Sequence, residues 1–222
     1  MSMRTVTLML FMSWLCATSP AQGQDISVGF TSQEIPDSVW QSMQGRSYQP
    51  NSQIRRKDLR YLHVLHWDYD NRTHQGELVC NRLIADKLIA IFRELYELHY
   101  PIQRMQLPDN YDADDERQMR DNNTSCFCYR PIAGSKRLSY HALGLAVDIN
   151  PLYNPCVKQR PDGSLSVQPA TGKAYTDRDK TFRYKITRND PCYRIFLRHG
   201  FSWGGSWRSS KDYQHFEYRL SK

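Results

Sequence analysis

Three side chains in two stretches of the sequence could together bind a metal ion. His141 and Asp148 flank Gly144 in SYHALGLAVD, and His215 lies among aromatic residues in DYQHFEY. Gly144 permits a turn, and LAVDIN after it is typical of a strand, so His141 can fold back beside Asp148. That pair alone could equally be a simple His–Asp hydrogen bond. With His215 it makes three zinc-competent ligands, which leave a fourth tetrahedral position open for water, as a catalytic site needs.

The order of these motifs resembles one family of enzymes. SxHxxGxAxD, followed by W-GG-W and DxxHFE, resembles the zinc D-Ala-D-Ala metallopeptidases of bacterial cell walls, which include VanX/VanY-like carboxypeptidases and L-alanyl-D-glutamate endopeptidases. The match is specific over residues 139–151 and 201–218 and looser over 59–138, where GELVCN, IFRELY and YPIQRM contribute. The resemblance implies an α+β domain with the hedgehog/D-Ala-D-Ala peptidase fold, a small antiparallel sheet with flanking helices.

The resemblance also implies which residues bind the metal and act as base. It assigns Zn²⁺ to His141, Asp148 and His215, and it makes Asp212 the general base. Several relatives have Glu at the position of Asp212, so its reach is shorter here. Glu217 is the other candidate for the base, and it suits equally a position behind His215 that orients the imidazole.

Three more residues are expected to contact the substrate. By resemblance, Arg130 binds the region of the scissile carbonyl, where it would stabilise developing negative charge; a surface salt bridge is the alternative. Ser139 contacts substrate or, alternatively, stabilises the turn before His141. Trp207, with Trp203, could wall the cleft or serve packing alone.

These residues together predict zinc-dependent hydrolysis of a peptidoglycan stem peptide. The D-alanyl-D-alanine carboxypeptidases and the L-alanyl-D-glutamate endopeptidases share the motifs, so both types stay open. The alternative is a catalytically silent, metal-containing binding module for cell-wall peptide or a protein partner. Asp212 and Arg130 favour catalysis, because a binding module needs no base beside its metal ligand. The sequence has no GxSxG motif and no evident Cys–His nucleophile.

Other possible metal ligands carry less weight. His63 and His66 form HxxH, but on a strand they lie on opposite faces. His74 and His99 are expected at the surface. The acidic segment 109–123 lacks the Gly-centred spacing of a calcium loop and is predicted to be an exposed loop or short helix.

Composition limits the possible classes of protein. The 222 residues are 40% hydrophobic and 24% charged, which predicts one globular domain, and no later apolar run is long enough for a membrane span. The net charge of +7 suits an anionic surface such as a cell-wall polymer. The basic residues are scattered and form no nucleic-acid-binding motif, so no nucleic-acid partner is expected. The sequence does not indicate an oligomeric state.

The N-terminus is predicted to direct export. Arg4 precedes a short apolar run over 6–15, followed by small and polar residues with a plausible cleavage site after Ala21 or Gly23. Residues 1–23 are therefore expected to be a signal peptide, and the mature protein to be periplasmic or extracellular. Residues 24–58 are expected to be a loosely packed polar extension, and residues 59–222 the peptidase domain.

Hydrophobic spacing predicts the elements of that domain. A strand begins at Leu59, with Leu62 and Val64 on one side. A helix capped by Asn81 and ended by Pro101 follows, and its stripe of core residues is Leu83, Ile84, Leu88, Ile91, Phe92, Leu95 and Leu98. Residues 157–180 are predicted to form a hairpin-like excursion, 191–199 a short helix and 216–220 a final strand.

Five cysteines would remain after export. Cys80 lies in an apolar run and is predicted to be a buried thiol. Cys126 and Cys128 are too close in sequence to pair comfortably with each other, and the CxC alone is a weak metal signal. Cys156 and Cys192, at the two ends of the excursion, are the pair expected to form a disulfide.

Overall fold

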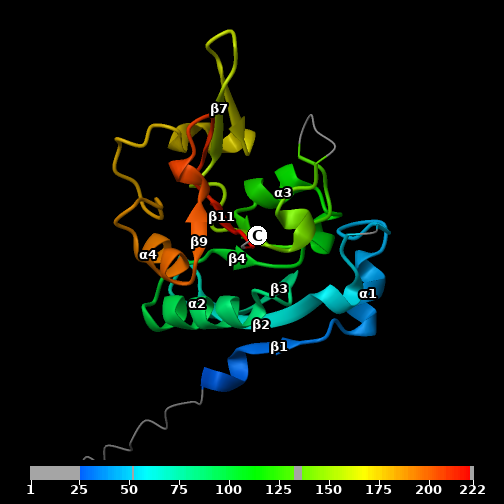
Figure 1. The fold of residues 1–222 in the computed structure, drawn as a ribbon. Coiled ribbons are helices and arrows are strands. Elements are labelled where there is room, and N and C mark those ends of the chain that lie inside the picture. Colours follow the sequence, from blue (N-terminus) through cyan, green and yellow to red (C-terminus); the bar gives the residue numbers. More distant parts are fainter. Residues whose placement is uncertain (1–25, 52, 133–136, 221–222) are drawn as a thin grey trace, which may run out of the picture.

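A long antiparallel hairpin forms the base of the molecule in the view of Figure 1. The computed structural model describes residues 26–51, 53–132 and 137–220, so the predicted signal peptide lies outside the described residues. The hairpin consists of β2 (Leu59–Trp67) and β3 (Thr73–Asn81), and the short β1 (Thr31–Gln33) pairs with β2 at its edge. The strand predicted from Leu59 is thus confirmed, and Leu62 and Val64 are both fully buried on one face.

A second, smaller sheet lies above the hairpin and carries two of the predicted metal ligands, Asp148 and His215. Its strand order is β6-β11-β9, all antiparallel, with β11 in the centre. The bounds are β6 (Ala146–Asp148), β9 (Phe201–Trp203) and β11 (His215–Tyr218). A third sheet, β10-β7-β8, consists of β7 (Cys156–Gln159), β8 (Leu165–Gln168) and β10 (Lys211–Asp212). The parallel pair β4 (Arg104–Met105) and β5 (Asn123–Thr124) completes the strands of the described residues.

Helices flank these sheets, as expected for an α+β protein. The α-helices are α1 (Asp37–Met43), α2 (Ala85–Glu97), α3 (Asp115–Arg120) and α4 (Pro191–Arg198). Short 3-10 turns cover Ile26–Gly29, Arg56–Asp58, Pro108–Tyr111, His141–Leu143, Ala170–Tyr175 and Gly204–Ser206. The fold class predicted from the sequence, small antiparallel sheets with flanking helices, is confirmed. Within the described ranges, no helix is long and apolar enough to cross a membrane.

The main core lies between α2, the hairpin β2–β3 and the small sheet. Phe92 of α2, Phe196 of α4 and Phe216 of β11 are almost fully buried there, and the rings of Phe196 and Phe216 stack at 4.3 Å. A fully buried aromatic side chain contributes a few kcal/mol of hydrophobic stabilisation, so this cluster fixes the small sheet against the helices.

The boundaries of α2 differ from the prediction. Asn81 does not cap the helix; it ends β3, and its side chain accepts a hydrogen bond from Leu83 N at 3.1 Å in a turn that precedes the helix. Leu83 and Leu98 therefore lie outside α2 and are 49% and 59% exposed, so their assignment to the core stripe is wrong. The five residues between them in the predicted stripe are buried.

The prediction that residues 24–58 pack loosely is also wrong for the described residues from Phe30 onward. Ile35, Met43, Tyr48 and Ile54 are 7% exposed or less and form a second core cluster against the other face of β2–β3. The segment is polar overall, but these four apolar residues point inward.

Five further predictions are settled by the fold. The hairpin-like excursion (β7–β8), the helix over 191–199 (α4) and the final strand (β11) are confirmed, with shifts of a few residues at their ends. The acidic segment 109–123 forms a short helix as predicted but is not simply exposed, because Asp109 and Gln118 are buried. The disulfide between Cys156 and Cys192 is wrong: both thiols are free, since Cys192 packs in the core from α4 and Cys156 lies on β7.

Candidate metal centre

Two neighbouring strands and one turn position the three predicted ligands. Asp148 on β6 pairs directly with His215 on β11 in the antiparallel register, so both side chains leave the sheet on one face. His141 begins the 3-10 turn His141–Leu143 that leads into β6. All three side chains are buried, with exposed fractions of 7% or less.

Gly144 makes this turn possible. It ends the turn in the left-handed conformation with φ of +66°, and a Cβ there would lie 2.6 Å from the backbone nitrogen of Asn81. Asn81 N donates to Gly144 O at 2.9 Å, and Asn81 Nδ2 donates to Leu143 O at 2.9 Å. The Asn that ends the GELVCN stretch thus fixes the turn that presents His141.

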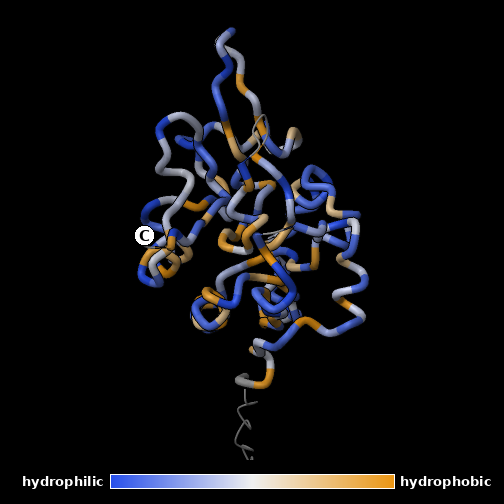
Figure 2. The backbone as a smooth tube through the Cα atoms, turned by 45° about the vertical axis from the view of Figure 1, so that its right-hand side comes forward, coloured by the Kyte–Doolittle hydropathy of each residue, from blue (hydrophilic) through white to orange (hydrophobic). Residues whose placement is uncertain are grey.

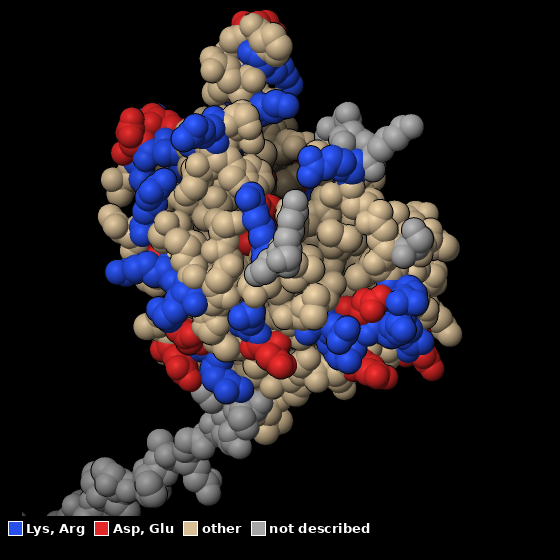
Figure 3. Space-filling view, in the orientation of Figure 1, with Lys and Arg blue, Asp and Glu red and all other residues tan. Residues whose placement is uncertain are grey.

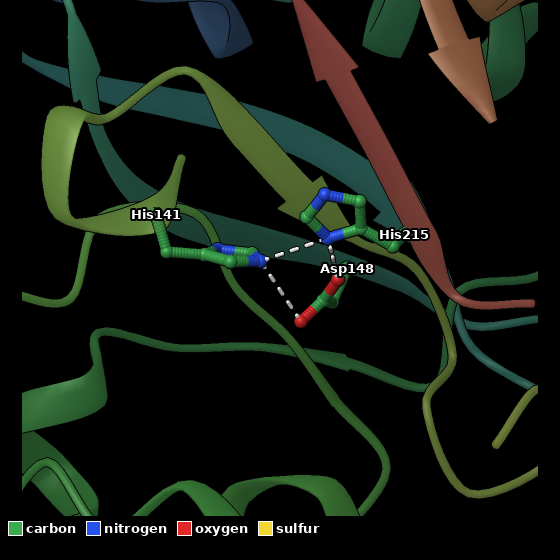
Figure 4. Close-up of side chains that lie close together, drawn as sticks. All are labelled: His141, Asp148 and His215. Carbon is green, nitrogen blue, oxygen red and sulfur yellow. Dashed lines mark hydrogen bonds and ion pairs between the residues drawn. The ribbon is translucent and has the colours of Figure 1, made fainter. Parts of the chain in front are cut away.

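The ligand atoms converge on one point. His141 Nε2 lies 3.1 Å from His215 Nδ1 and 3.2 Å from Asp148 Oδ2, and His215 Nδ1 lies 3.1 Å from Asp148 Oδ1. Figure 4 shows the two rings and the carboxylate facing one another. Nitrogen ligands about 2.05 Å from a tetrahedral zinc ion lie about 3.3 Å apart, so the donor set fits such an ion.

Hydrogen bonds on the outer side of each ring select the ligand nitrogen. His141 Nδ1 donates to the carbonyl oxygen of Cys126 at 2.7 Å, which leaves Nε2 with a free lone pair toward the cluster. His215 Nε2 donates to Glu217 Oε2 at 3.3 Å, which does the same for Nδ1. Two lone pairs directed at the same point repel unless a cation lies between them, and this arrangement is typical of metal ligands.

The electrostatics of the cluster point the same way. Burial would raise the pKa of Asp148, but the adjacent imidazoles of His141 and His215 hold it well below its usual range. Burial would lower the pKa of His215, but hydrogen bonds to Asp148 and Glu217 raise it to about 10. The cluster therefore favours a positive charge beside the ionised Asp148, whether that charge is a proton or a metal ion.

The cluster lies in the wall of an open cavity of about 620 Å³. Figure 3 shows a hollow beneath the projecting hairpin, with Lys and Arg side chains on its rim. Seven of the residues predicted for the site line this cavity: His141, Asp148, His215, Asp212, Arg130, Ser139 and Trp207. The structure thus brings together residues from five separate parts of the chain, while their individual roles remain predictions.

Asp212 enters the cavity from β10 and is held close to the metal ligands. Gly204 allows this packing, because a Cβ there would lie 2.7 Å from Asp212 O and 3.2 Å from His215 Cβ. Among the described residues, nothing donates a hydrogen bond to Asp212 Oδ1. Burial raises the pKa of Asp212 to about 6, partly opposed by the charge of His215. A carboxylate with such a pKa can exchange a proton near neutral pH.

The residues predicted to contact substrate differ in the contacts that they make within the protein. Arg130 forms an ion pair with Asp115 Oδ2 at 2.8 Å, so it is held at the cavity wall. Ser139 Oγ accepts from Ala142 N at 3.1 Å, and the hydroxyl thus stabilises the turn at His141 while lining the cavity. The ring of Trp207 lies 5.2 Å from that of His215. Trp203 does not line the cavity; it is buried in the core.

Part of the cavity wall was not predicted from the sequence. Asp115, Lys158, Ser166 and Gln168 also line it. An acidic residue opposite Arg130 could have been suspected from the charge-rich segment 109–123, but no spacing rule links the two. The other three lie on the hairpin β7–β8. Their spacing shows that they share one face of the hairpin only when the pairing register of its two strands is known.

Four other histidines lie elsewhere in the structure. His63 and His66 are on opposite faces of β2, as predicted; His66 Nδ1 donates to Ile102 O at 2.8 Å, and His63 Nε2 contacts the hydroxyl of Tyr61 at 2.9 Å. His74 is exposed and contacts Asp68 Oδ2 at 2.7 Å, and His99 stacks on Trp67.

A buried His–Asp–His cluster at the wall of an open cavity that also holds a carboxylate with a raised pKa defines the class of metal-dependent hydrolase centres. The comparison with protein families agrees: residues 133–218 match the family described as D-alanyl-D-alanine carboxypeptidase. The C-terminal part of the chain is thus similar to this family of peptidases, and the match supports the resemblance drawn from the motifs over that range. No match was found among curated proteins or solved structures.

Proposed function

We propose that this protein is a zinc peptidase that hydrolyses peptidoglycan stem peptides, of the D-alanyl-D-alanine carboxypeptidase or the L-alanyl-D-glutamate endopeptidase type. The observation that carries the proposal is the convergence of His141 Nε2, Asp148 and His215 Nδ1 in a cavity lined by Asp212 and Arg130. The family match covers all of the ligands and Asp212.

The predicted ligands, the predicted base and Arg130 each have a defined role in this proposal. His141, Asp148 and His215 would hold Zn²⁺, which would supply a Lewis acid and lower the pKa of a water molecule in the site. Asp212 accepts the proton at its carboxylate and returns it to the leaving amine. The guanidinium of Arg130, held by Asp115, donates hydrogen bonds to the carbonyl oxygen of the scissile peptide, where negative charge develops.

The proposal includes export to the periplasm or the cell exterior, where peptidoglycan lies. The apolar run over residues 6–15 supports it, and the net charge of +7 favours association with an anionic cell-wall polymer. Fractionation of cells that produce the full chain, with N-terminal sequencing of the product, tests this part of the proposal separately from the chemistry.

Product analysis of purified muropeptides tests the activity. We expect the zinc-loaded protein to cleave them, and a chelator to abolish cleavage until zinc is restored. Loss of one terminal alanine would establish a carboxypeptidase, and release of a peptide beginning with D-glutamate would establish an endopeptidase. Bound zinc and bound peptide without any cleavage would contradict the proposal in favour of a binding module.

Asp212→Asn tests the assignment of the base. We expect this variant to retain zinc and to lose turnover by about 10²-fold or more, because the amide cannot accept a proton. His215→Ala should lose both zinc and activity. Full activity in Asp212→Asn would refute the assignment.

The pH profile gives an independent measurement. With its pKa raised to about 6, Asp212 takes up a proton as the pH falls, so kcat/KM should decline about tenfold per unit on the acid side. Nearby bound zinc favours the ionised form and moves this decline to lower pH. In Asp212→Asn, the residual activity should lack that acid limb.

A further inference from the structure

The hairpin β7–β8 presents one of its faces to the cavity. Cys156 and Lys158 alternate along β7, Ser166 and Gln168 alternate along β8, and all four line the cavity. The antiparallel register pairs Cys156 with Gln168 and Lys158 with Ser166, so the four side chains form two cross-strand pairs on one face. The opposite face and the tip extend away from the molecule, and Figure 2 shows the tip mostly in the colour of hydrophilic residues.

This face is continuous with the candidate base. β10 pairs with β7 on the side away from β8, and Asp212 lies opposite Cys156 in that pairing. Asp212, Cys156 and Gln168 therefore form a row across three hydrogen-bonded strands. A peptide chain in the cavity that reaches Asp212 at one end of this row would lie against the hairpin, with Lys158 and Ser166 one step further from the base.

Lys158 is the residue of this face whose charge is uncompensated. The other cation that lines the cavity, Arg130, is held by Asp115 at 2.8 Å. Within the described part of the chain, no acidic side chain forms an ion pair with Lys158, which is exposed at the cavity edge. An ammonium group without a counter-ion in the wall of a cleft attracts an anionic group of a ligand.

We infer that Lys158 binds a carboxylate of the peptide substrate, and that Ser166 and Gln168 hydrogen-bond to the peptide beside it. The inference rests on the proposed peptidase function and assigns the hairpin as its specificity element. Such a carboxylate has two sources, the C-terminus of the peptide and the free α-carboxyl of its D-glutamate residue. Either gives a charge-assisted hydrogen bond with the ammonium group.

Substitution combined with substrate amidation tests this inference. Steady-state kinetics of the zinc-loaded full chain would compare three synthetic stem peptides: one with all carboxylates free, one with a C-terminal amide and one with the D-glutamate α-carboxyl amidated. We expect Lys158→Met to raise KM for the free peptide about tenfold and to change kcat by less than about twofold. One of the two amidated peptides should raise KM in the wild-type protein by the same factor, and should cause no further rise of KM in Lys158→Met. The carboxylate that is amidated in that peptide is the one that Lys158 binds.

Lys173→Met is the matched control. Lys173 is exposed on the turn Ala170–Tyr175 next to the hairpin and does not line the cavity, so this variant makes the same change of net charge elsewhere. It should keep the KM of the wild type. An equal rise of KM in both variants would mean that only long-range charge acts and would overturn the inference, as would an unchanged KM in Lys158→Met.

Calorimetric titration of the same peptides separates this inference from the proposed function. Cleavage without any effect of Lys158 on KM or Kd refutes the inference alone. Carboxylate-dependent binding through Lys158 without cleavage refutes the catalytic proposal but supports the inferred contact. A protein that neither cleaves nor binds the three peptides refutes both.

Discussion

Glu217 lies outside the predicted ligand set but contacts one of its members directly. Its carboxylate accepts from His215 Nε2 at 3.3 Å and from Arg219 Nε at 2.8 Å. The side chain is 3% exposed and lies behind the ring of His215. This position supports the orienting role over the role of base, because the carboxylate is already engaged on the outer side of the imidazole.

Glu217→Gln is expected to weaken zinc binding about 10- to 100-fold, because a neutral amide holds the Nε2 proton less strongly and orients the ring less firmly. Competition with a chromogenic chelator measures the affinity. Glu97→Gln, the same substitution at the exposed end of α2, is the control and should bind zinc like the wild type. Unchanged affinity in Glu217→Gln would show that Arg219 and Glu217 serve the fold alone.

Residue types and spacing were sufficient to predict that His141, Asp148 and His215 lie together, since they occur in motifs whose order alone resembles a peptidase family. The partners of those ligands were harder to predict. Cys126 acts through its backbone carbonyl, which no residue type reveals. The pair of Arg130 and Asp115 joins segments whose proximity depends on tertiary structure.

At the scale of elements, α4 begins with a cap formed by a partly buried Asp. Asp190 accepts from Cys192 N at 2.8 Å, and Pro191 occupies the first helical position. Burial raises the pKa of Asp190 to about 6, although the hydrogen bond from Cys192 N opposes this rise. An unfolded Asp has a pKa of about 3.9, so ionisation of this group disfavours the folded state.

Asp190→Asn should therefore stabilise the protein at neutral pH. Asn caps a helix about as well as Asp and carries no charge. The stabilising contribution of the protonated wild-type carboxyl is complete below about pH 4 and is lost as the pH rises through about 6, so the two proteins should melt alike near pH 4. Near neutral pH we expect a Tm about 2–4 °C higher in the variant, measured by calorimetry. A lower Tm there would show that the charge itself stabilises α4.

Elements with strong periodicity were predicted better than elements defined by turns. The alternation from Leu59 gave β2 correctly, and the turn residues Pro-Asp-Gly located the excursion β7–β8. The start of α2 was predicted too early, because Asn81 forms a local turn that resembles a cap in sequence. An Asn side chain can cap a helix or stabilise a turn after a strand. The sequence does not show which of the two Asn81 does unless the end of the preceding strand is known.

At the scale of the whole molecule, the N-terminal segment belongs to the structure that supports the site. Its apolar side chains pack with Phe127, and the backbone of Phe127 donates to Val79 O at 2.9 Å in β3. The preceding residue, Cys126, supplies the carbonyl that holds His141. Low overall hydropathy concealed this role, because only a few apolar residues of the segment form the contact.

Met43→Ala should destabilise the protein by about 2–5 kcal/mol, because Met43 is fully buried and its removal leaves a cavity in the second core cluster. Equilibrium unfolding in urea measures the change. Val28→Ala, at a position 75% exposed, should change stability by less than about 0.5 kcal/mol. Equal, small effects of the two substitutions would show that the segment contributes little to folding.

The position of β11 within its sheet has a consequence for how the chain folds. This strand lies between β6 and β9, yet both of its neighbours precede it in the sequence, β6 by about 70 residues. Until β11 inserts, β6 and β9 have edges without a partner, and such edges readily pair with other chains. Because pairing over long sequence separations is slow, aggregation competes with this step. The strand that carries His215 is therefore also the strand that must pair before the edges of β6 and β9 are protected from self-association.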